Sequence, residues 1–177
     1  MNKEEFSEPI MIYHYQYKTP IFTTINLYAT ERNLVGLTLP TQTYLTNNHI
    51  YTIHKVHENT ALLETCNWLS IYLQGRSPLF LPPIAPIGNS FQKTVWQELL
   101  TIPYGTTTTY GTVAKKVAIL LKKSRMSPQA IGRAVGHNPI PIIIPCHRVI
   151  GCQGRLVGYN GGLDAKLTLL HLEGITL

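Results

Sequence analysis

Apolar and polar residues alternate along three segments in the first half of the chain, and alternation is the period of a half-buried β-strand. These segments are rich in β-branched and aromatic residues and cover 22–30, 33–41 and 49–56. Helical spacing follows within 58–75, where apolar residues recur at Leu62, Leu63, Cys66, Leu69 and Leu73 and where Gly75 supplies a C-cap. The pattern predicts a small antiparallel sheet with one packed helix, and it makes the tyrosine-rich segment 10–18 an edge strand.

Apolar residues in most of the second half show helical spacing. Helices are expected within 90–102, 109–121, 127–139 and 161–174. The expected N-caps are Ser90 and Ser127, with Pro128 at the first helical position; the expected core positions are Phe91, Val95, Leu99, Leu163, Leu167 and Leu170. The second and third helices are short and joined by a tight basic turn, which is typical of a helix-turn-helix. The predicted fold class is α+β, with a mostly helical, winged-helix-like second unit.

A proline-rich segment from Pro78 to Ser90 separates these two regions and indicates a linker or an extended wrap. We therefore expect an N-terminal α+β cap at 1–88, with the linker at 78–88, and a second domain at 89–177. The charge changes at the same point. Five basic and six acidic residues lie in 1–88, whereas ten basic and three acidic residues lie in 89–177. This excess favours a polyanionic partner such as nucleic acid, although a basic surface also serves solubility alone.

The composition excludes several classes of protein. Apolar residues make up 44% of the chain and charged residues 14%, which suits a packed core. No apolar run reaches the roughly 18 residues of a membrane-spanning helix, and the acidic first residues do not resemble a secretory signal. The three cysteines lack disulfide or CxxC spacing, so we expect a reducing, cytoplasmic compartment. His49, His54 and His57 lie close together but lack a cysteine partner, so no metal site is expected.

The third predicted helix has an unusual polar face. Ile131 and Val135 lie one turn apart and are expected to face the core. The opposite face carries Gln129, Ala130, Arg133, Gly136 and His137. A major-groove reader displays several long polar side chains, whereas small residues around a single arginine suit close approach to the minor groove. The alternative is that these small residues pack against another helix.

Cysteine chemistry is indicated by the segment 138–151. Its apolar run Ile142–Ile144 predicts a short buried strand that delivers Cys146 between a proline and a histidine. A buried free cysteine is usually a small apolar residue. Here His147 and Arg148 can withdraw the thiol proton or stabilise the thiolate, which is the nucleophilic species. Because adjacent residues on an extended chain point apart, His147 is expected to act through a turn or a bridging water.

Five short blocks of the second half stand in a fixed order. They are IGRAVG at 131–136, NP at 138–139, PCHRV at 145–149, GYNGGL at 158–163 and LEG at 172–174. Together they resemble the O6-alkylguanine-DNA alkyltransferases, also called methylated-DNA–protein-cysteine methyltransferases. The resemblance is dense from about Phe91 to Gly174, and the first 88 residues carry little of it.

The resemblance implies a role for each matching residue. Cys146 would accept the alkyl group, and His147 would deprotonate it through a water. Glu173 would orient that histidine, and Asn138 would brace the site. Tyr110 would rotate the target phosphate and donate a hydrogen bond to the flipped guanine.

The same resemblance implies how DNA is held. Arg133 would enter through the minor groove and fill the gap left by the flipped nucleotide. The other implied DNA contacts are Tyr110, Gln129, Ala130, Gly132 and Ala134, and the implied base pocket comprises Pro141, Val149, Tyr159 and Asn160. No cofactor is implied. Some relatives bind zinc through N-terminal cysteines, but only Cys66 lies in that half of this chain, so no zinc is expected. Arg155 and Val157 stand where relatives often carry smaller residues, which bears on the tolerated alkyl size.

The resemblance implies a DNA repair protein that flips O6-alkylguanine out of the duplex and transfers the alkyl group irreversibly to Cys146, once per molecule. O4-alkylthymine is a second candidate lesion. The expected partner is double-stranded DNA, bound as a monomer through the minor groove, with cooperative binding left open and no membrane involved. The alternatives are a non-catalytic binder of alkylation lesions, a helix-turn-helix regulator and a cysteine hydrolase. The presence of Cys146 and the bare helix face count against the first two.

Overall fold

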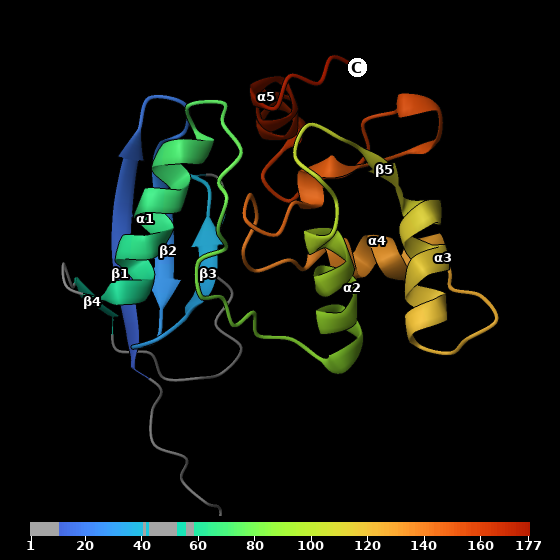
Figure 1. Cartoon of the computed structure of the whole chain (residues 1–177), viewed down its shortest axis with the longest axis horizontal. Helices are drawn as coiled ribbons and strands as arrows, with labels where there is room; N and C mark the ends of the chain where they lie inside the picture. Colours follow the sequence, from blue (N-terminus) through green and yellow to red (C-terminus); the bar gives the residue numbers. More distant parts are fainter. Residues whose placement is uncertain (1–10, 41, 43–52, 56–58) are drawn as a thin grey trace, which may run out of the picture.

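The computed structural model describes residues 11–40, 42, 53–55 and 59–177 and has the predicted mixture of a small sheet and several helices (Figure 1). The strands of the main sheet are β1 (Ile12–Thr19), β2 (Thr23–Ala29), β3 (Leu34–Thr38) and β4 (Ile53–Lys55), and they lie in the order β3-β2-β1-β4. The α+β class is confirmed. The edge position expected for the tyrosine-rich strand is wrong, because β1 lies between β2 and β4. The β1–β4 pair is parallel, so the sheet is mixed. A strand's own alternation cannot show that a distant segment pairs with it.

Helix α1 (Thr60–Tyr72) packs on this sheet, as predicted. The Asn59 side chain caps it by accepting a hydrogen bond from the Leu62 N–H. Gly75 follows the helix with a φ of +73°, a left-handed conformation that favours glycine. Leu63 is 56% exposed, so it does not belong to the buried stripe.

The proline-rich linker runs as an extended wrap along the outer edge of β3. The Leu34 N–H donates to the Pro83 carbonyl, and the Ala85 N–H donates to the Leu34 carbonyl, each at 2.8 Å. Ile84 lies opposite Leu34 in a parallel bridge. The linker is therefore a fixed element, attached to the sheet before the chain enters its second half.

Helix α2 (Ser90–Leu100) begins at the residue that was predicted to be its cap. Asn89, not Ser90, is the N-cap, and its side chain and that of Gln92 form a reciprocal capping box. Both Asn and Ser cap helices well, and the glutamine three residues after Asn89 decides between them. Val95 and Leu99 are buried as predicted, whereas Phe91 is half-buried.

The helix-turn-helix is confirmed. It consists of α3 (Tyr110–Leu120), capped by Thr109, and α4 (Pro128–Gly136), capped by Ser127, and both helices pack against α2. Ile131 and Val135 face the core as expected. A short parallel pair, β5 (Thr108–Thr109) with β6 (Val149–Ile150), joins the start of this motif to the later part of the chain.

The predicted strand at Ile142–Ile144 is wrong, although all three residues are buried. The segment is a turn in which the Ile144 N–H donates to the Ile140 carbonyl and Ile142 adopts a φ of +73°. Pro141 and Pro145, which flank this run, lack the N–H that a strand ladder requires, and this explains the turn. The chain then enters the short 3₁₀ helix η1 (Cys146–Arg148), and a second one, η2 (Cys152–Gly154), follows β6.

Helix α5 (Leu163–Leu172) buries Leu170 as predicted, but the rest of its inward face differs from the predicted one. Its buried residues are Lys166, Leu169 and Leu170, whereas Leu163 is 46% exposed. Lys166 can be buried because its Nζ donates to the carbonyls of Val149 and Val157, at 2.6 and 3.0 Å.

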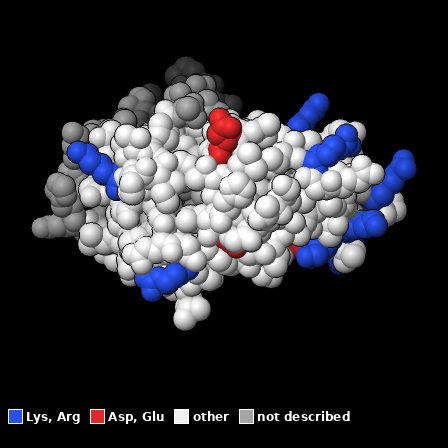
Figure 2. All heavy atoms as spheres, turned by 90° about the horizontal axis from the view of Figure 1, so that it is seen from above, with Lys and Arg blue, Asp and Glu red and all other residues white. Residues whose placement is uncertain are grey.

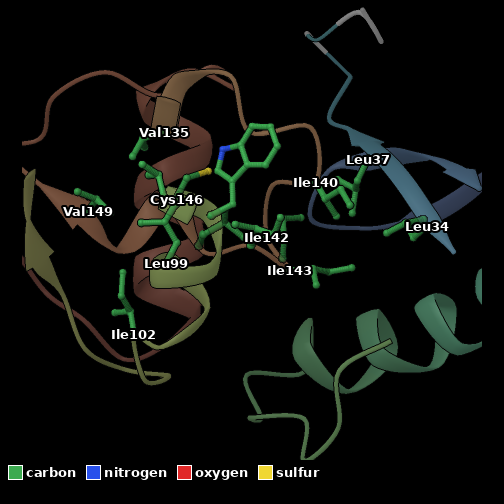
Figure 3. Packing of buried hydrophobic residues seen from close by; sticks show 14 of the residues in the cluster. Leu34, Leu37, Leu99, Ile102, Val135, Ile140, Ile142, Ile143, Cys146 and Val149 are labelled. Atoms are coloured by element: carbon green, nitrogen blue, oxygen red, sulfur yellow. The ribbon is translucent and has the colours of Figure 1, made fainter. Parts of the chain in front are cut away.

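One apolar core extends through both halves of the chain. Leu37 of β3 and Ile140 of the turn after α4 belong to the same buried cluster and lie next to each other (Figure 3). The Leu37 N–H also donates to the Pro139 carbonyl at 2.8 Å. The sheet therefore fixes the segment that leads to Cys146. In the described part of the chain, none of the helices is long and apolar enough to cross a membrane.

Candidate active site

Cys146 opens η1 at the floor of a cavity of about 520 Å³, within the usual size of a small-molecule site. The residue is 5% exposed, so its sulfur is reached through that cavity and not from the open surface. Asn138 fixes the thiol: its Nδ2 donates to the Cys146 Sγ at 3.1 Å and to the Ile144 carbonyl at 2.8 Å. Its Oδ1 accepts from the Ile140 N–H at 3.0 Å, so Asn138 braces the turn as well as the sulfur.

The resting form of Cys146 is the neutral thiol. Burial raises its pKa, and this effect outweighs the Asn138 hydrogen bond and the nearby charge of Lys166, which both lower it. Burial also lowers the pKa of Lys166 to about 8. The buried Tyr159 hydroxyl makes no well-formed hydrogen bond, but it lies close enough to the sulfur for each group to influence the pKa of the other. The thiol therefore needs a base to become a nucleophile.

His147 follows Cys146 directly in the chain and is fully buried. Its Nε2 lies 2.7 Å from Glu173 Oε1, while its Nδ1 is buried with no partner among the described residues. No hydrogen bond joins His147 to Cys146, which agrees with the expectation that adjacent residues do not meet directly. Burial lowers the pKa of His147 more than the bond to Glu173 raises it, so the ring is neutral at neutral pH.

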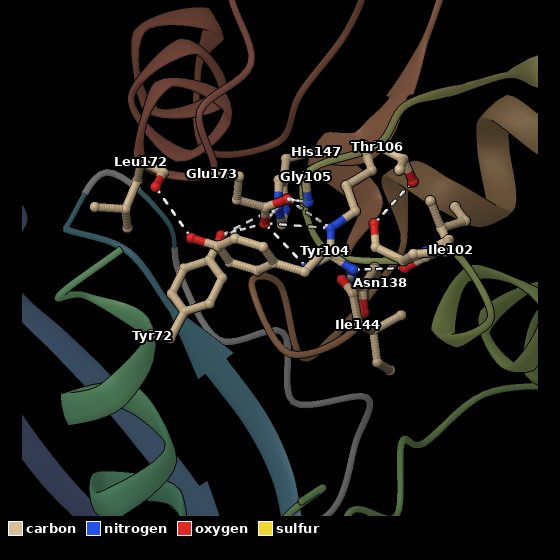
Figure 4. A network of polar contacts seen from close by, with 12 residues as sticks. Tyr72, Ile102, Tyr104, Gly105, Thr106, Asn138, Ile144, His147, Leu172 and Glu173 are labelled. Carbon is tan, nitrogen blue, oxygen red and sulfur yellow. Dashed lines mark hydrogen bonds and ion pairs between the residues drawn. The ribbon is translucent and has the colours of Figure 1, made fainter. Parts of the chain in front are cut away.

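Glu173, just after α5, is the centre of a buried polar network (Figure 4). Its carboxylate accepts hydrogen bonds from His147, from the Tyr72 hydroxyl at 2.6 Å, from the Arg148 guanidinium at 2.9 Å and from the Gly105 N–H at 3.1 Å. Burial alone would raise the pKa of Glu173, but the hydrogen bonds from His147, Arg148 and Tyr72 hold it at about 2. The carboxylate stays charged and oriented.

Arg148 does not serve the thiol, contrary to the sequence-based interpretation. Its Nε and Nη2 bind Glu173, and its Nη1 donates to the Ile102 carbonyl at 2.6 Å. Sequence reasoning also missed Tyr72 and Lys166 at this site. A lysine within the otherwise apolar helix 163–172 was an available signal for Lys166, but nothing in the sequence distinguishes Tyr72 from the other tyrosines of the first half.

The opposite wall of the cavity comes from the helix-turn-helix. Tyr110 of α3 and Gln129, Gly132 and Gly136 of α4 line it, and Pro141, Tyr159 and Asn160 complete the rim. Of the four predicted pocket residues, Pro141, Tyr159 and Asn160 line the cavity. Val149 does not; it is fully buried, and its carbonyl accepts a hydrogen bond from Lys166. The loop 158–162 approaches the sheet so closely that a Cβ on Gly161 would lie 2.9 Å from Leu39 and from Tyr159.

The predicted DNA-contacting residues of α4 do not all lie on one surface. Arg133 is exposed and Ala130 is half-buried, and both line a second hollow beside the cavity. Ala134, in contrast, is 2% exposed, and its carbonyl accepts a hydrogen bond from Trp96 Nε1 at 2.8 Å. Its methyl group lies in the core because it follows Ile131 by three positions on the packed side of α4. The structure therefore argues against a direct DNA contact by the Ala134 side chain.

Basic side chains gather at the α3 end of the molecule, away from the sheet (Figure 2). The exposed basic residues of α3 and of the turn after it are Lys115, Lys116, Lys122, Lys123 and Arg125. No cluster of three or more histidine, cysteine or acidic side chains that could hold a metal occurs among the described residues. His49 and His57 lie outside the described residues, as does the side chain of His54.

Cys146 and the helix-turn-helix line the same cavity, so a group bound in this cavity lies beside both the thiol and α4. Fold and site together define a nucleic-acid-binding protein that reacts through a cysteine. Residues 90–175 match the family described as "6-O-methylguanine DNA methyltransferase, DNA binding domain".

Similar proteins extend this match beyond residues 90–175 to most of the chain. The methylated-DNA–protein-cysteine methyltransferase of Mycobacterium leprae is 47% identical over 116 residues, which cover 66% of this chain and 67% of that protein. The enzyme of the same name from Methanosarcina acetivorans is 47% identical over 111 residues, which cover 63% and 68%. The crystal structure of Mycobacterium tuberculosis OGT in complex with DNA superimposes with a TM-score of 0.74 at 34% identity, covering 93% of this chain and 92% of that one. The chain belongs to the methylated-DNA–protein-cysteine methyltransferase family.

Proposed function

We propose that this protein repairs O6-alkylguanine in double-stranded DNA by transferring the alkyl group to its own Cys146. The observation that carries the proposal is the position of the Cys146 sulfur, at the floor of a cavity whose outer wall is α4. A regulator would not need a thiol there, and a cysteine hydrolase would not need a helix-turn-helix beside it. O4-alkylthymine is a second candidate substrate, since it presents a similar alkylated oxygen.

The target base must leave the duplex, because its alkylated oxygen lies inside the base stack. The small residues Ala130 and Gly132 allow α4 to approach a minor groove closely, and the exposed Arg133 is long enough to occupy the place of the extruded nucleotide. Gln129 and Tyr110 stand at the cavity mouth, where they can bind the DNA backbone. Pro141, Tyr159 and Asn160 receive the base, and Val149 supports them from the core.

The reaction begins with the loss of the thiol proton. His147 Nδ1 accepts this proton through a water, and Glu173 stabilises the imidazolium that forms. The thiolate attacks the alkyl carbon, so that an S–C bond forms and the C–O bond to guanine breaks. The Tyr110 hydroxyl donates a hydrogen bond to the leaving base. The product is a thioether, which no group of the site can hydrolyse, so each molecule acts once.

The organisation of the chain fits this scheme. We infer two units, an N-terminal cap at 1–88 and a DNA-binding and catalytic unit at 89–177, acting together as a monomer on DNA. The protein would act in the cytoplasm, because Cys66, Cys146 and Cys152 are all free and the reaction requires a reduced thiol. No cofactor takes part, since the protein itself is the alkyl acceptor.

Intact-protein and peptide mass spectrometry tests the proposal. After incubation with a duplex that contains O6-methylguanine, we expect one added methyl group per protein, located on the Cys146 peptide. The Cys146→Ser variant should gain none, while Cys152→Ser, which removes an exposed cysteine outside the cavity, should react like the wild type. A wild type that binds the lesion without gaining a methyl group, or a methyl group on Cys152, would exclude the proposed transfer.

A further inference from the structure

Tyr72 connects the N-terminal sheet region to the reactive centre. It is the last residue of α1, and its hydroxyl reaches the carboxylate of Glu173 at the other end of the chain (Figure 4). The ring is fully buried, stacked on Trp68 with centroids 5.0 Å apart and packed edge-on against Tyr104 at 6.0 Å. Its hydroxyl therefore has little freedom to turn elsewhere.

The direction of its hydrogen bond is determined by chemistry. A phenol has one proton, and the Tyr72 hydroxyl donates it to Glu173 Oε1 at 2.6 Å, because a charged carboxylate has no proton to give. Towards His147 Nε2, at 3.2 Å, the Tyr72 oxygen can then only accept. Glu173 Oε1, at 2.7 Å from the same nitrogen, is also only an acceptor.

Both groups that face His147 Nε2 are thus acceptors, and a ring nitrogen between two acceptors carries the proton. The proton on Nε2 leaves Nδ1 with its lone pair, on the side of the ring that has no protein partner among the described residues. Without the Tyr72 hydroxyl, one acceptor is lost and one donor is removed from the carboxylate. The ring is then less strictly held in this tautomer and orientation.

We propose that Tyr72 is a positioning residue, whose hydroxyl holds His147 in the tautomer that keeps Nδ1 free to accept the thiol proton. This inference rests on the proposed function, because it assumes that His147 is the base for Cys146. It makes the N-terminal unit a part of the reactive apparatus. The chemistry acts through His147, and Tyr72 itself does not touch the substrate.

The test compares Tyr72→Phe with Tyr104→Phe. Both variants remove one tyrosine hydroxyl from neighbouring rings, but the Tyr104 hydroxyl donates to the Leu172 carbonyl and not to the carboxylate of Glu173. Two rates are measured as a function of pH: methyl transfer from an O6-methylguanine duplex, and alkylation of the Cys146 peptide by iodoacetamide. The second rate needs no DNA and reports the thiolate alone.

A positioning role predicts a pH-dependent loss. Near neutral pH both rates of Tyr72→Phe should fall about tenfold. This is the lower end of the reduction in activity that follows when a histidine loses the group that orients it. At alkaline pH, where the thiol ionises without a base, the rates should approach those of the wild type. The other groups that face the pair, namely Asn138, Tyr110, Tyr159, Lys166 and Arg148, are the same in both proteins. Glu173 loses the hydrogen bond from Tyr72, but those from His147 and Arg148 still lower its pKa, so it stays ionised over this pH range. Tyr104→Phe should stay within about twofold of the wild type at every pH.

A loss of equal size at all pH values, or no loss relative to Tyr104→Phe, would overturn the inference. Faster iodoacetamide alkylation in Tyr72→Phe would also overturn it, because this result indicates an opened site. If the wild type takes no methyl group from DNA while the iodoacetamide rates behave as predicted, the proposed function fails and the role of Tyr72 stands.

Nuclear magnetic resonance provides an independent readout. Long-range proton–nitrogen correlations of the His147 ring should show a proton on Nε2 in the wild type and in Tyr104→Phe. In Tyr72→Phe the same spectrum should show a mixture of the two tautomers. A proton on Nδ1 in the wild type, or an unchanged spectrum in Tyr72→Phe, would contradict the proposed positioning.

Discussion

The two sides of the Cys146 site are built in opposite ways. The inner wall is the buried network of His147, Arg148 and Glu173, which lies outside the cavity lining, and the outer wall is helix α4, which lines the cavity and the second hollow beside it. On the inner wall the functional groups are buried and densely hydrogen-bonded: Glu173 alone accepts from four different residues. On the outer wall α4 presents small side chains, and its one long cation, Arg133, is exposed. The hydrogen bonds of the inner wall are already formed in the free protein. The side chains of the outer wall are open to solvent and would gain contacts only when DNA binds.

This difference separates two requirements of the proposed reaction. Groups that stabilise developing charge act best when they are fixed in advance and shielded from water. Groups that enter a duplex must move, and they become ordered only in the complex. Substitutions on the inner wall should therefore impair chemistry with every substrate, and those on the outer wall should impair only reactions with duplex DNA.

The largest effect is expected from Glu173→Gln, which breaks the inner wall. The substitution leaves the buried Arg148 guanidinium without its counter-charge, and this should cost about 3–5 kcal/mol of unfolding free energy. Methyl transfer should slow at least about a hundredfold, because His147 loses the charge that stabilises its protonated form. Urea unfolding and the transfer rate measure the two effects. Asp164→Asn, an exposed acid of α5, is the matched control, and equal behaviour of the two variants would contradict the comparison.

Acid should remove the same stabilisation from the wild type. The pKa of Glu173 is about 2 in the folded protein and lies near its ordinary value of 4.5 in the unfolded chain. Its contribution is therefore fully present above pH 4.5 and is lost as the pH falls towards 2. The shift corresponds to about 3 kcal/mol. Urea unfolding over this pH range should show a smaller decline for Glu173→Gln than for the wild type. Parallel declines would show that other groups govern the acid transition.

A smaller and more selective effect is expected on the outer wall. Arg133→Ala should slow repair of duplex DNA about tenfold, since it removes the side chain proposed to occupy the gap in the stack. Reaction with free O6-benzylguanine should stay within about twofold of the wild type, because this substrate requires no extrusion. Arg76→Ala removes the same charge from an exposed position outside both hollows and is the control. Equal reductions in rate with both substrates would mean that Arg133 acts in the alkyl-transfer step and not in base extrusion.

The smallest effect is expected at the cavity rim. Val157 lines the cavity, and its truncation to alanine enlarges an apolar pocket. Val157→Ala should therefore increase the ratio of the rate with O6-benzylguanine to the rate with O6-methylguanine about threefold. Arg155→Ala, two residues away and outside the lining of the cavity, should leave the ratio unchanged. Competition between the two substrates gives this ratio directly. An unchanged ratio in Val157→Ala would mean that this side chain does not limit alkyl size.

Local signals predicted much of this architecture. The cap Ser127 and the apolar pair Ile131 and Val135 act within one or two turns, so the helix-turn-helix could be deduced from neighbouring residues. The strand assigned to the isoleucine run failed because prolines removed its hydrogen-bond donors.

Non-local pairing was harder to predict. The central position of β1 depends on β4, which follows it by more than thirty residues. The Tyr72–Glu173 bond joins residues 101 positions apart. The motif that identified Cys146 and His147 carries no information about a tyrosine on the other side of the core. Local sequence patterns cannot reveal such a contact, because it forms only when the sheet region and α5 are packed together.

The backbone bonds between the linker and β3 have a further consequence. A sheet edge with free N–H and carbonyl groups invites association with strands of other molecules. Here the linker residues around Ile84 occupy the outer edge of β3. The segment that connects the two halves of the chain therefore also protects this edge of the sheet from association. Lengthening or loosening this segment would expose the outer edge of β3 to pairing with strands of other molecules.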